Sequence, residues 1–130
     1  MPTRRLFAAL IVVAAVCLST PGHAASAQDF ASKTFAEAQN AGRPILIAVH
    51  ARWCPVCMVQ KLVMNTLLWD RKFDEVIYLV VDFDRQKDQV RRFGAMTQST
   101  LIVFRGRVEQ GRSVGETDRE SISELMEKVL

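Results

Sequence analysis

The sequence predicts a single α/β domain in which helices cover both faces of a mixed four-stranded sheet. The continuous apolar run at residues 45–49 and the largely apolar segment at residues 76–83 have the composition of buried strands. A helical pattern follows each run, so these strands should be parallel and joined by a right-handed crossover. A hairpin and an amphipathic helix complete the order β-α-β-α-β-β-α, with one further helix in front.

The first 27 residues have the features of a cleavable signal peptide, and the predicted domain therefore covers residues 28–130. Two arginines precede an unbroken apolar run over residues 6–18, which is too short to span a bilayer. The small residues Ala25-Ser26-Ala27 then suit cleavage before Gln28. The alternative is an uncleaved membrane anchor. We expect an exported protein, located in the periplasm or otherwise outside the cytoplasm.

The distribution of charge along the sequence bears on whether the protein binds nucleic acid. Cleavage removes two arginines and leaves fifteen basic against fourteen acidic residues, so the net charge falls from +3 to +1. The basic residues are scattered among acidic ones and form no stripe, which argues against nucleic-acid binding. A chain of this length makes one domain with one core, and we expect a monomer.

The predicted helices and strands follow in order along the chain. A first helix covers residues 29–41, with Phe30, Phe35 and Ala38 at helical spacing, and Gly42 and Pro44 end it. The strand at residues 45–49 comes next and should lie in the middle of the sheet.

The following helix should run from Cys54 to about Leu68, because Pro55 suits the first helical position. Its inner stripe is expected to be Val56, Val59, Val63 and Leu67. After the strand at residues 76–83, a short polar helix should cover residues 84–93 and end at Gly94.

The sequence of the last third of the chain predicts a β-hairpin followed by a helix. Residues 101–104 and 108–110 flank Arg105-Gly106-Arg107, which is typical of a tight turn. Thr117 and Glu120 form a capping box. The helix behind it should bury the stripe Ile122, Leu125, Met126 and Val129.

The number and spacing of the cysteines indicate a reactive pair and not a purely structural disulfide. Cys17 would leave with the signal peptide, so the exported domain keeps only Cys54 and Cys57. A bridge between residues three apart constrains the unfolded chain little, so the pair is expected to react and not merely to stabilise. Zinc needs about four ligands and covalent haem needs a histidine where Met58 stands, so both are disfavoured.

Trp53-Cys54-Pro55-Val56-Cys57, at a strand-to-helix junction, resembles the active site of the thioredoxin family. The resemblance covers most of the domain and extends to Val81-Asp82-Phe83-Asp84, Phe93-Gly94, the run from Ser99 to Phe104, and Val114-Gly115. It implies a thioredoxin-like fold and thiol–disulfide oxidoreductase activity. No cofactor is implied besides the redox-active Cys54–Cys57 disulfide.

Physical chemistry supports the same assignment of the two catalytic residues. Cys54 would lie at a helix N-terminus, where unpaired N–H groups and the helix dipole favour a thiolate. Cys57, one turn later, should be shielded and act as the resolving thiol. In the family, the residues corresponding to Trp53, Pro55 and Val56 shape the docking surface for the substrate.

The sequence departs from the family pattern at two places. The buried acid and its lysine partner fall at Ala48 and Val80, which leaves His50 as the nearby candidate for proton transfer, although core packing is a common role for such a histidine. The usual cis-proline is replaced by Ser99, so we expect a trans Gln98–Ser99 bond. We also expect a reshaped loop over residues 96–100, in which Ser99 and Thr100 shape the docking site.

Loss of that proline leaves an alternative function open. The cysteine pair would bind Cu(I), with Met96 or Met58 as a thioether ligand, or an iron–sulfur cluster. A third alternative is a redox-inert docking module, which the intact cysteine pair disfavours.

Redox direction and partners follow from the same resemblance. Val56 offers the Cys54 thiolate no hydrogen-bond donor, unlike the histidine of strongly oxidising relatives, so reduction or exchange is favoured over oxidation. The segment Thr66-Leu67-Leu68-Trp69-Asp70 is similar to the thioredoxin-like domain at the end of membrane thiol-electron transporters. Expected partners are disulfide-containing exported proteins and a membrane electron-transfer protein that supplies the electrons.

Overall fold

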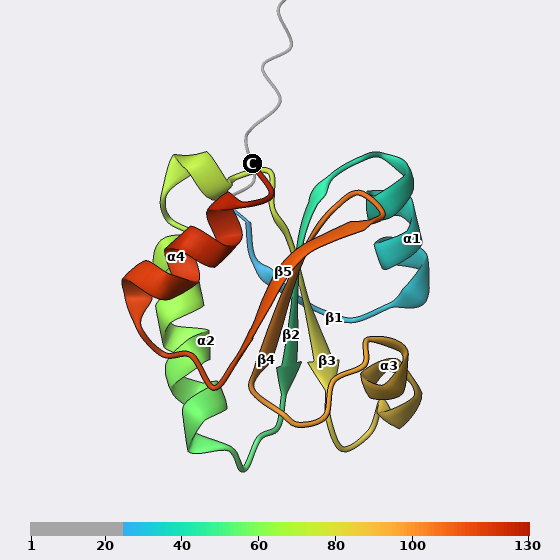
Figure 1. Cartoon of the computed structure of the whole chain (residues 1–130), viewed down its shortest axis with the longest axis vertical. Coiled ribbons are helices and arrows are strands. Elements are labelled where there is room, and N and C mark those ends of the chain that lie inside the picture. The colour runs from blue at the N-terminus through green and yellow to red at the C-terminus, as the bar shows by residue number, and fades with distance from the viewer. Residues whose placement is uncertain (1–24) are drawn as a thin grey trace, which may run out of the picture.

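A computed structural model of the chain describes residues 25–130 (Figure 1). Most of the predicted signal peptide lies outside these residues. The first strand, β1 (Ala27–Asp29), begins one residue before the predicted cleavage point. Within residues 25–130, no helix combines the length and the apolar character needed to cross a bilayer.

The sheet is mixed, as predicted, and has the strand order β1-β3-β2-β4-β5. The central strand is β2 (Pro44–His50), which pairs in parallel with β3 (Ile77–Asp82) and antiparallel with β4 (Thr100–Arg105). The predicted hairpin joins β4 to β5 (Val108–Val114), and Gly106 has the positive φ of 57° that its turn requires.

The predicted number of four strands was wrong, because β1 adds a fifth strand to the edge of the sheet. It pairs in parallel with β3 over three residues, all of them exposed. A three-residue exposed strand has no hydrophobic alternation, so only its pairing with Tyr78, Leu79 and Val80 defines it. The first helix consequently starts at Ser32 and not at residue 29.

Helices cover both faces, as predicted. In Figure 1, α2 (Pro55–Leu67) and α4 (Arg119–Glu127) lie on one face of the sheet, and α1 (Ser32–Asn40) and α3 (Lys87–Arg92) lie on the other. A single turn of 3₁₀ helix, Arg71–Phe73, follows α2. Each face has its own apolar core, one around Leu46, Met64 and Ile122 and the other around Phe35, Ile47 and Phe93.

Of the predicted inner stripe of α2, Leu67 is buried as expected, but the other three positions were wrong by one residue. The buried residues are Cys57, Gln60, Met64 and Leu67, whereas Val56 and Val59 are exposed and Val63 is half-buried. Positions 57, 60, 64 and 67 share one helix face, and the first of them is the second cysteine. The helix therefore turns its Cys57 face to the sheet and leaves the valines at positions 56 and 59 outside.

The start of α4 also differs from the prediction. Its N-cap is Asp118 and not Thr117, because the Asp118 carboxylate accepts the N–H of Ser121 at 2.8 Å. The predicted apolar stripe is buried as expected, although its last residue, Val129, lies just beyond the end of the helix.

Candidate active site

Cys54 is the N-cap residue of α2, in the loop that leaves the carboxyl end of β2. Its Sγ accepts a hydrogen bond from the backbone N–H of Cys57, with 3.2 Å between sulfur and nitrogen. Pro55 occupies the start of the helix, where its missing N–H is not needed. The Cys54 sulfur therefore faces the positive end of the helix, where a negative charge on it is favoured.

Cys57 has a different environment. Both cysteines are free thiols, but Cys57 keeps only 1% of its surface exposed. Burial raises the pKa of Cys57 to about 11, and the hydrogen bond with Cys54 acts in the same direction, whereas hydrogen bonds with the backbones of Ala51 and Ser99 oppose both. Cys57 therefore holds its proton at neutral pH.

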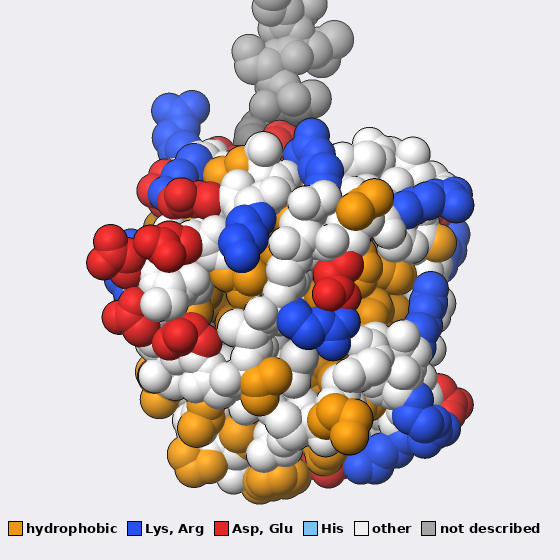
Figure 2. Space-filling model, in the orientation of Figure 1, with side chains coloured by type: hydrophobic (Ala, Val, Ile, Leu, Met, Phe, Trp, Pro, Cys, Tyr) orange, Lys and Arg blue, Asp and Glu red, His pale blue; other side chains and the backbone are white. Residues whose placement is uncertain are grey.

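Exposed side chains surround the first cysteine. Cys54 itself is only 3% exposed, but Trp53 is 60% exposed, and Pro55 and Val56 are exposed as well. Figure 2 shows apolar side chains gathered at the lower end of the molecule, where α2 begins in Figure 1. A partner that reaches the Cys54 sulfur therefore has to come through an apolar surface.

The orientation of Trp53 is fixed from the opposite side of the site. Its Nε1–H donates to Asp84 Oδ2 at 2.9 Å, and its ring packs edge-on against Phe83 with 6.4 Å between centroids. Both contacts come from the segment that follows β3, so Trp53 links the start of α2 to that segment.

Ser99 lies at the base of the site. The Gln98–Ser99 peptide bond is trans, as predicted, and Ser99 has a left-handed φ of 58°. Its N–H donates to the Val49 carbonyl at 2.8 Å, and its own carbonyl accepts the N–H of Gly115 at 2.9 Å. Proline has no N–H and is fixed at a negative φ, so this loop has a backbone that the family's proline cannot adopt.

The two loop residues predicted to shape the site are both buried. Thr100, the first residue of β4, donates its hydroxyl to the Thr97 carbonyl at 2.8 Å, and the Ser99 hydroxyl donates to the Gln98 carbonyl at 2.6 Å. Thr97 and Gln98 are half-buried and Met96 is exposed, so these three residues form the accessible part of the loop.

Gln60 is a site residue that the sequence analysis missed. It is 2% exposed, and its Nε2 donates to the carbonyl oxygens of Ser99 at 3.1 Å and Glu116 at 2.9 Å. The signal for it was the spacing of Cys57, Gln60 and Met64, which is that of one helix face. A polar residue at the centre of such a face indicates a buried hydrogen-bonding role.

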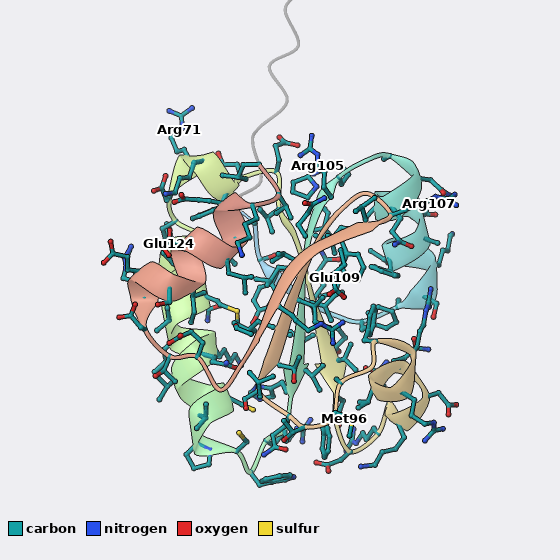
Figure 3. All side chains as sticks on the ribbon, viewed as in Figure 1. Arg71, Met96, Arg105, Arg107, Glu109 and Glu124 are labelled. Atoms are coloured by element: carbon teal, nitrogen blue, oxygen red, sulfur yellow. The ribbon has the colours of Figure 1, made fainter. Side chains whose placement is uncertain are left out.

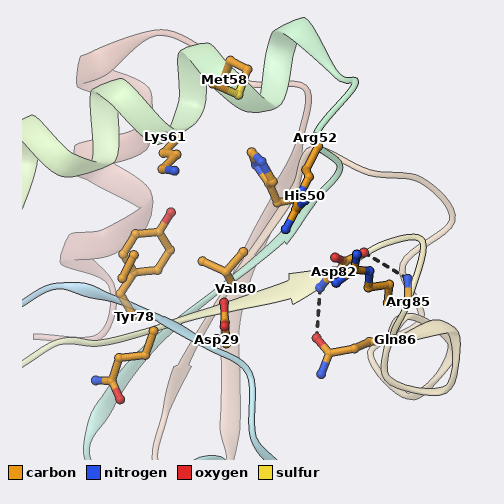
Figure 4. Close-up of a pocket in the computed structure, with 12 residues that line it drawn as sticks. Asp29, His50, Arg52, Met58, Lys61, Tyr78, Val80, Asp82, Arg85 and Gln86 are labelled. Carbon is orange, nitrogen blue, oxygen red and sulfur yellow. Dashed lines mark hydrogen bonds between the residues drawn. The ribbon is translucent and has the colours of Figure 1, made fainter.

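His50 ends β2 and lies beside α2. It lines a cavity together with Arg52, Met58 and Lys61 (Figure 4). Burial lowers the pKa of His50, the charges of Lys61 and Arg52 lower it further, and Asp82 opposes them. The ring is therefore neutral at pH 7.

Residues 25–130 contain no cluster of three or more His, Cys, Asp or Glu side chains. Met96 projects from the loop before β4, near the lower end of Figure 3, and Met58 is exposed on α2.

The fold and the site together define a small α/β protein with a Cys-x-x-Cys pair at the start of a helix. Residues 26–128 match the family model for Thioredoxin. A thioredoxin of Chlamydia muridarum is 31% identical over 84 residues, which is 65% of this chain and 80% of that protein. The chain belongs to the thioredoxin family, and it is a thiol–disulfide oxidoreductase, as predicted.

Solved structures agree with this conclusion. The crystal structure of Trxlp from Edwardsiella tarda is 35% identical and superposes with a TM-score of 0.75, covering 78% of this chain and 98% of that one. Thioredoxin from Trypanosoma brucei brucei shares the fold at 17% identity, with a TM-score of 0.71 over 85% of this chain and 96% of that one. The thioredoxin-like fold predicted from the sequence is confirmed.

Proposed function

We propose that this protein is exported and that it reduces or exchanges disulfides in other exported proteins. One observation supports the exchange chemistry: the Cys54 sulfur accepts the Cys57 N–H at the start of α2, while Cys57 stays buried and protonated one turn later. These are the two sulfur environments that a two-step exchange needs.

In the first step the Cys54 thiolate attacks one sulfur of the substrate disulfide. The substrate S–S bond breaks, a Cys54–substrate disulfide forms, and the leaving thiolate takes a proton from solvent. In the second step Cys57 loses its proton and attacks the Cys54 sulfur, which forms the Cys54–Cys57 disulfide and releases the second substrate thiolate. Two electrons pass from the cysteine pair to the substrate, and no other cofactor takes part.

The second step requires a proton acceptor for Cys57, and we assign this role to His50. The neutral ring of His50 is able to accept a proton at pH 7, and it lies at the end of β2 beside the first turns of α2. If His50 is this base, His50→Gln slows the release of a trapped mixed disulfide at pH 7 by about a hundredfold or more. A release rate equal to that of the unchanged protein would assign the proton to solvent instead.

The direction of electron flow is proposed from Val56. The side chain of this residue, which lies between the two cysteines, has no hydrogen-bond donor to stabilise the reduced, thiolate form. The pair should then release its electrons readily, and a membrane electron-transfer protein would have to return them. Trp53, Pro55 and Val56 provide the apolar surface for docking of the substrate protein, and the protein acts as a monomer.

A redox titration tests the direction. The purified protein is equilibrated in glutathione buffers, and its dithiol fraction is counted by mass after alkylation. We expect a potential nearer to about −270 mV, the value of thioredoxin, than to about −120 mV, the value of strongly oxidising relatives. A potential at the oxidising end would overturn the proposed direction but not the exchange chemistry.

Export is tested separately by fractionating cells that express the complete chain. We expect the protein in the periplasmic fraction with Gln28 as its first residue. Protein that stays in the cytoplasm with its first 27 residues attached would exclude an exported role.

A further inference from the structure

A second candidate site lies beside α2 and does not include the cysteines. A cavity of about 760 Å³ opens between α2 and the parallel strands β1 and β3 (Figure 4). Tyr78 and Val80 of β3 line one side, and Met58 and Lys61 of α2 line another. The rest of the lining includes His50 and Arg52 as well as the two acids Asp29 and Asp82. This volume is typical of pockets that hold small organic molecules, which measure about 300–1,000 Å³.

Three cations line the cavity: Arg52 and Lys61 beside α2, and Arg85 in the segment that follows β3 (Figure 4). Within residues 25–130, Arg52, Lys61 and Arg85 form none of the ion pairs of the structure, which join other residues. One carboxylate oxygen of Asp82, Oδ1, accepts the backbone N–H groups of Asp84 and Arg85, at 2.9 and 3.0 Å. Figure 4 shows Asp29, the other acid, across Val80 from Lys61.

Tyr78 supplies a second, independent observation. The residue is 2% exposed, and its hydroxyl forms no hydrogen bond with the part of the chain that the structure describes. Figure 4 shows that this hydroxyl points into the cavity toward Lys61. Because no group of the described chain accepts this donor, the hydroxyl is free to donate to a ligand that enters the cavity.

We propose that this cavity binds a carboxylate, held by the Tyr78 hydroxyl and the Lys61 ammonium group, with Arg52 and His50 beside it. An ionised carboxylate accepts several hydrogen bonds and complements the excess of cations. Val80 and Met58 offer apolar contact to the carbon chain that bears it. The carboxylate belongs either to a small free acid or to a Glu or Asp side chain of a peptide, and the proposal does not depend on the thiol chemistry.

The test is a titration of the reduced protein by NMR, with the backbone amides of β3 and α2 as probes. Glutarate is the free acid, and glutaramide is its uncharged control. The capped peptide acetyl-Ala-Glu-Ala-amide represents an acidic side chain, and acetyl-Ala-Gln-Ala-amide is its control. We expect saturable shifts around Tyr78 and Lys61 with at least one of the two carboxylates and with neither amide.

Variants assign the binding groups. Lys61→Gln and Tyr78→Phe should each weaken carboxylate binding about tenfold, because each removes one hydrogen bond to a charged group. Lys33→Gln, at an exposed position of α1, is the matched control and should bind like the unchanged protein. Cys54→Ser should also bind normally, which separates this site from the exchange chemistry.

Three outcomes would overturn the proposal: no saturable shift with either carboxylate, equal binding of the amides, or binding unchanged by Lys61→Gln. Because Lys61 is exposed, this last variant remains informative even if Tyr78→Phe fails to fold. Binding of glutarate alone would identify a free acid as the ligand, and binding of the peptide would identify an acidic side chain of a partner.

Discussion

The side-chain amide of Gln60 donates a hydrogen bond to the carbonyl oxygen of Ser99 at 3.1 Å and a second one to Glu116 at 2.9 Å. Gln60 lies one turn after Cys57 on the same helix, so it joins the helix that carries both cysteines to the loops before β4 and after β5. The hydrogen bond to Ser99 therefore anchors to α2 the loop that lacks the family's proline.

Replacing Gln60 tests this link. Gln60→Met keeps the length of the side chain but leaves the Glu116 carbonyl without its Gln60 donor, so the free energy of unfolding should fall by about 1–3 kcal/mol. Urea denaturation measures the change. Gln110→Met, at an exposed position in β5, is the control and should stay within about 0.5 kcal/mol. Equal effects of the two substitutions would show that the Gln60 hydrogen bonds add nothing.

Ser99 provides a second test, in which one substitution fits the backbone and the other does not. Ser99→Pro removes the N–H that donates to Val49 and is incompatible with a φ of 58°, so it should cost about 3 kcal/mol or more. Ser99→Gly relieves the left-handed strain and should be neutral or stabilising by up to about 1 kcal/mol. A proline variant as stable as the glycine variant would contradict the described loop.

The pKa of Cys57 predicts how stability depends on pH. Burial raises this pKa from 9.0 to about 11 in the folded, reduced protein. The folded state therefore holds its proton more tightly than the unfolded chain, and this contribution to stability is complete below pH 9 and lost as the pH rises toward 11. The free energy of unfolding of the reduced protein, measured by urea denaturation, should therefore fall over that range.

The oxidised protein is the control for this pH effect, because its disulfide has no thiol to titrate. The pKa of Tyr78, which burial also raises, affects both redox forms alike and cancels in the comparison. Parallel pH profiles for the two forms would mean that Cys57 is not a buried thiol.

Val56 tests the basis of the redox direction. Val56→His introduces a donor next to the Cys54 sulfur, as in strongly oxidising relatives, and should raise the potential by about 30–60 mV through one hydrogen bond to a charged group. Val59→His, one turn along the same exposed face, is the matched control and should leave the potential nearly unchanged. If the redox potential of the cysteine pair does not change in Val56→His, the residue at position 56 does not determine the redox direction.

Much of the fold could be predicted from the sequence because buried runs and helix signals are strong. Ile45–Val49 was predicted as a central strand and is completely buried, and Pro55 correctly indicated the start of α2. The strand β1 could not be predicted, since its three exposed residues are defined only by their pairing with β3. The sequence did not predict which face of α2 is buried. The valines are the more hydrophobic choice, but the buried face is the one that Cys57 shares with Gln60.

The site was predictable to a lesser extent. The sequence alone identified Cys54 and Cys57, because their spacing and the following helix are local features. The Gln60–Ser99 hydrogen bond joins residues 39 positions apart, and the Trp53–Asp84 hydrogen bond joins residues 31 apart. Such contacts depend on how the helices and strands pack, so a local sequence pattern does not predict which residues are the partners.

Trapping of the mixed disulfide tests the central claim most directly. Each single variant, Cys57→Ser and Cys54→Ser, is reduced, mixed with a disulfide-containing peptide at pH 7, quenched with acid and analysed by mass spectrometry. If Cys54 attacks and Cys57 resolves, the Cys57→Ser protein accumulates a peptide adduct on Cys54, and the Cys54→Ser protein stays almost free of adduct. Adducts that form at equal rates on both variants, or only on Cys57, would contradict the account.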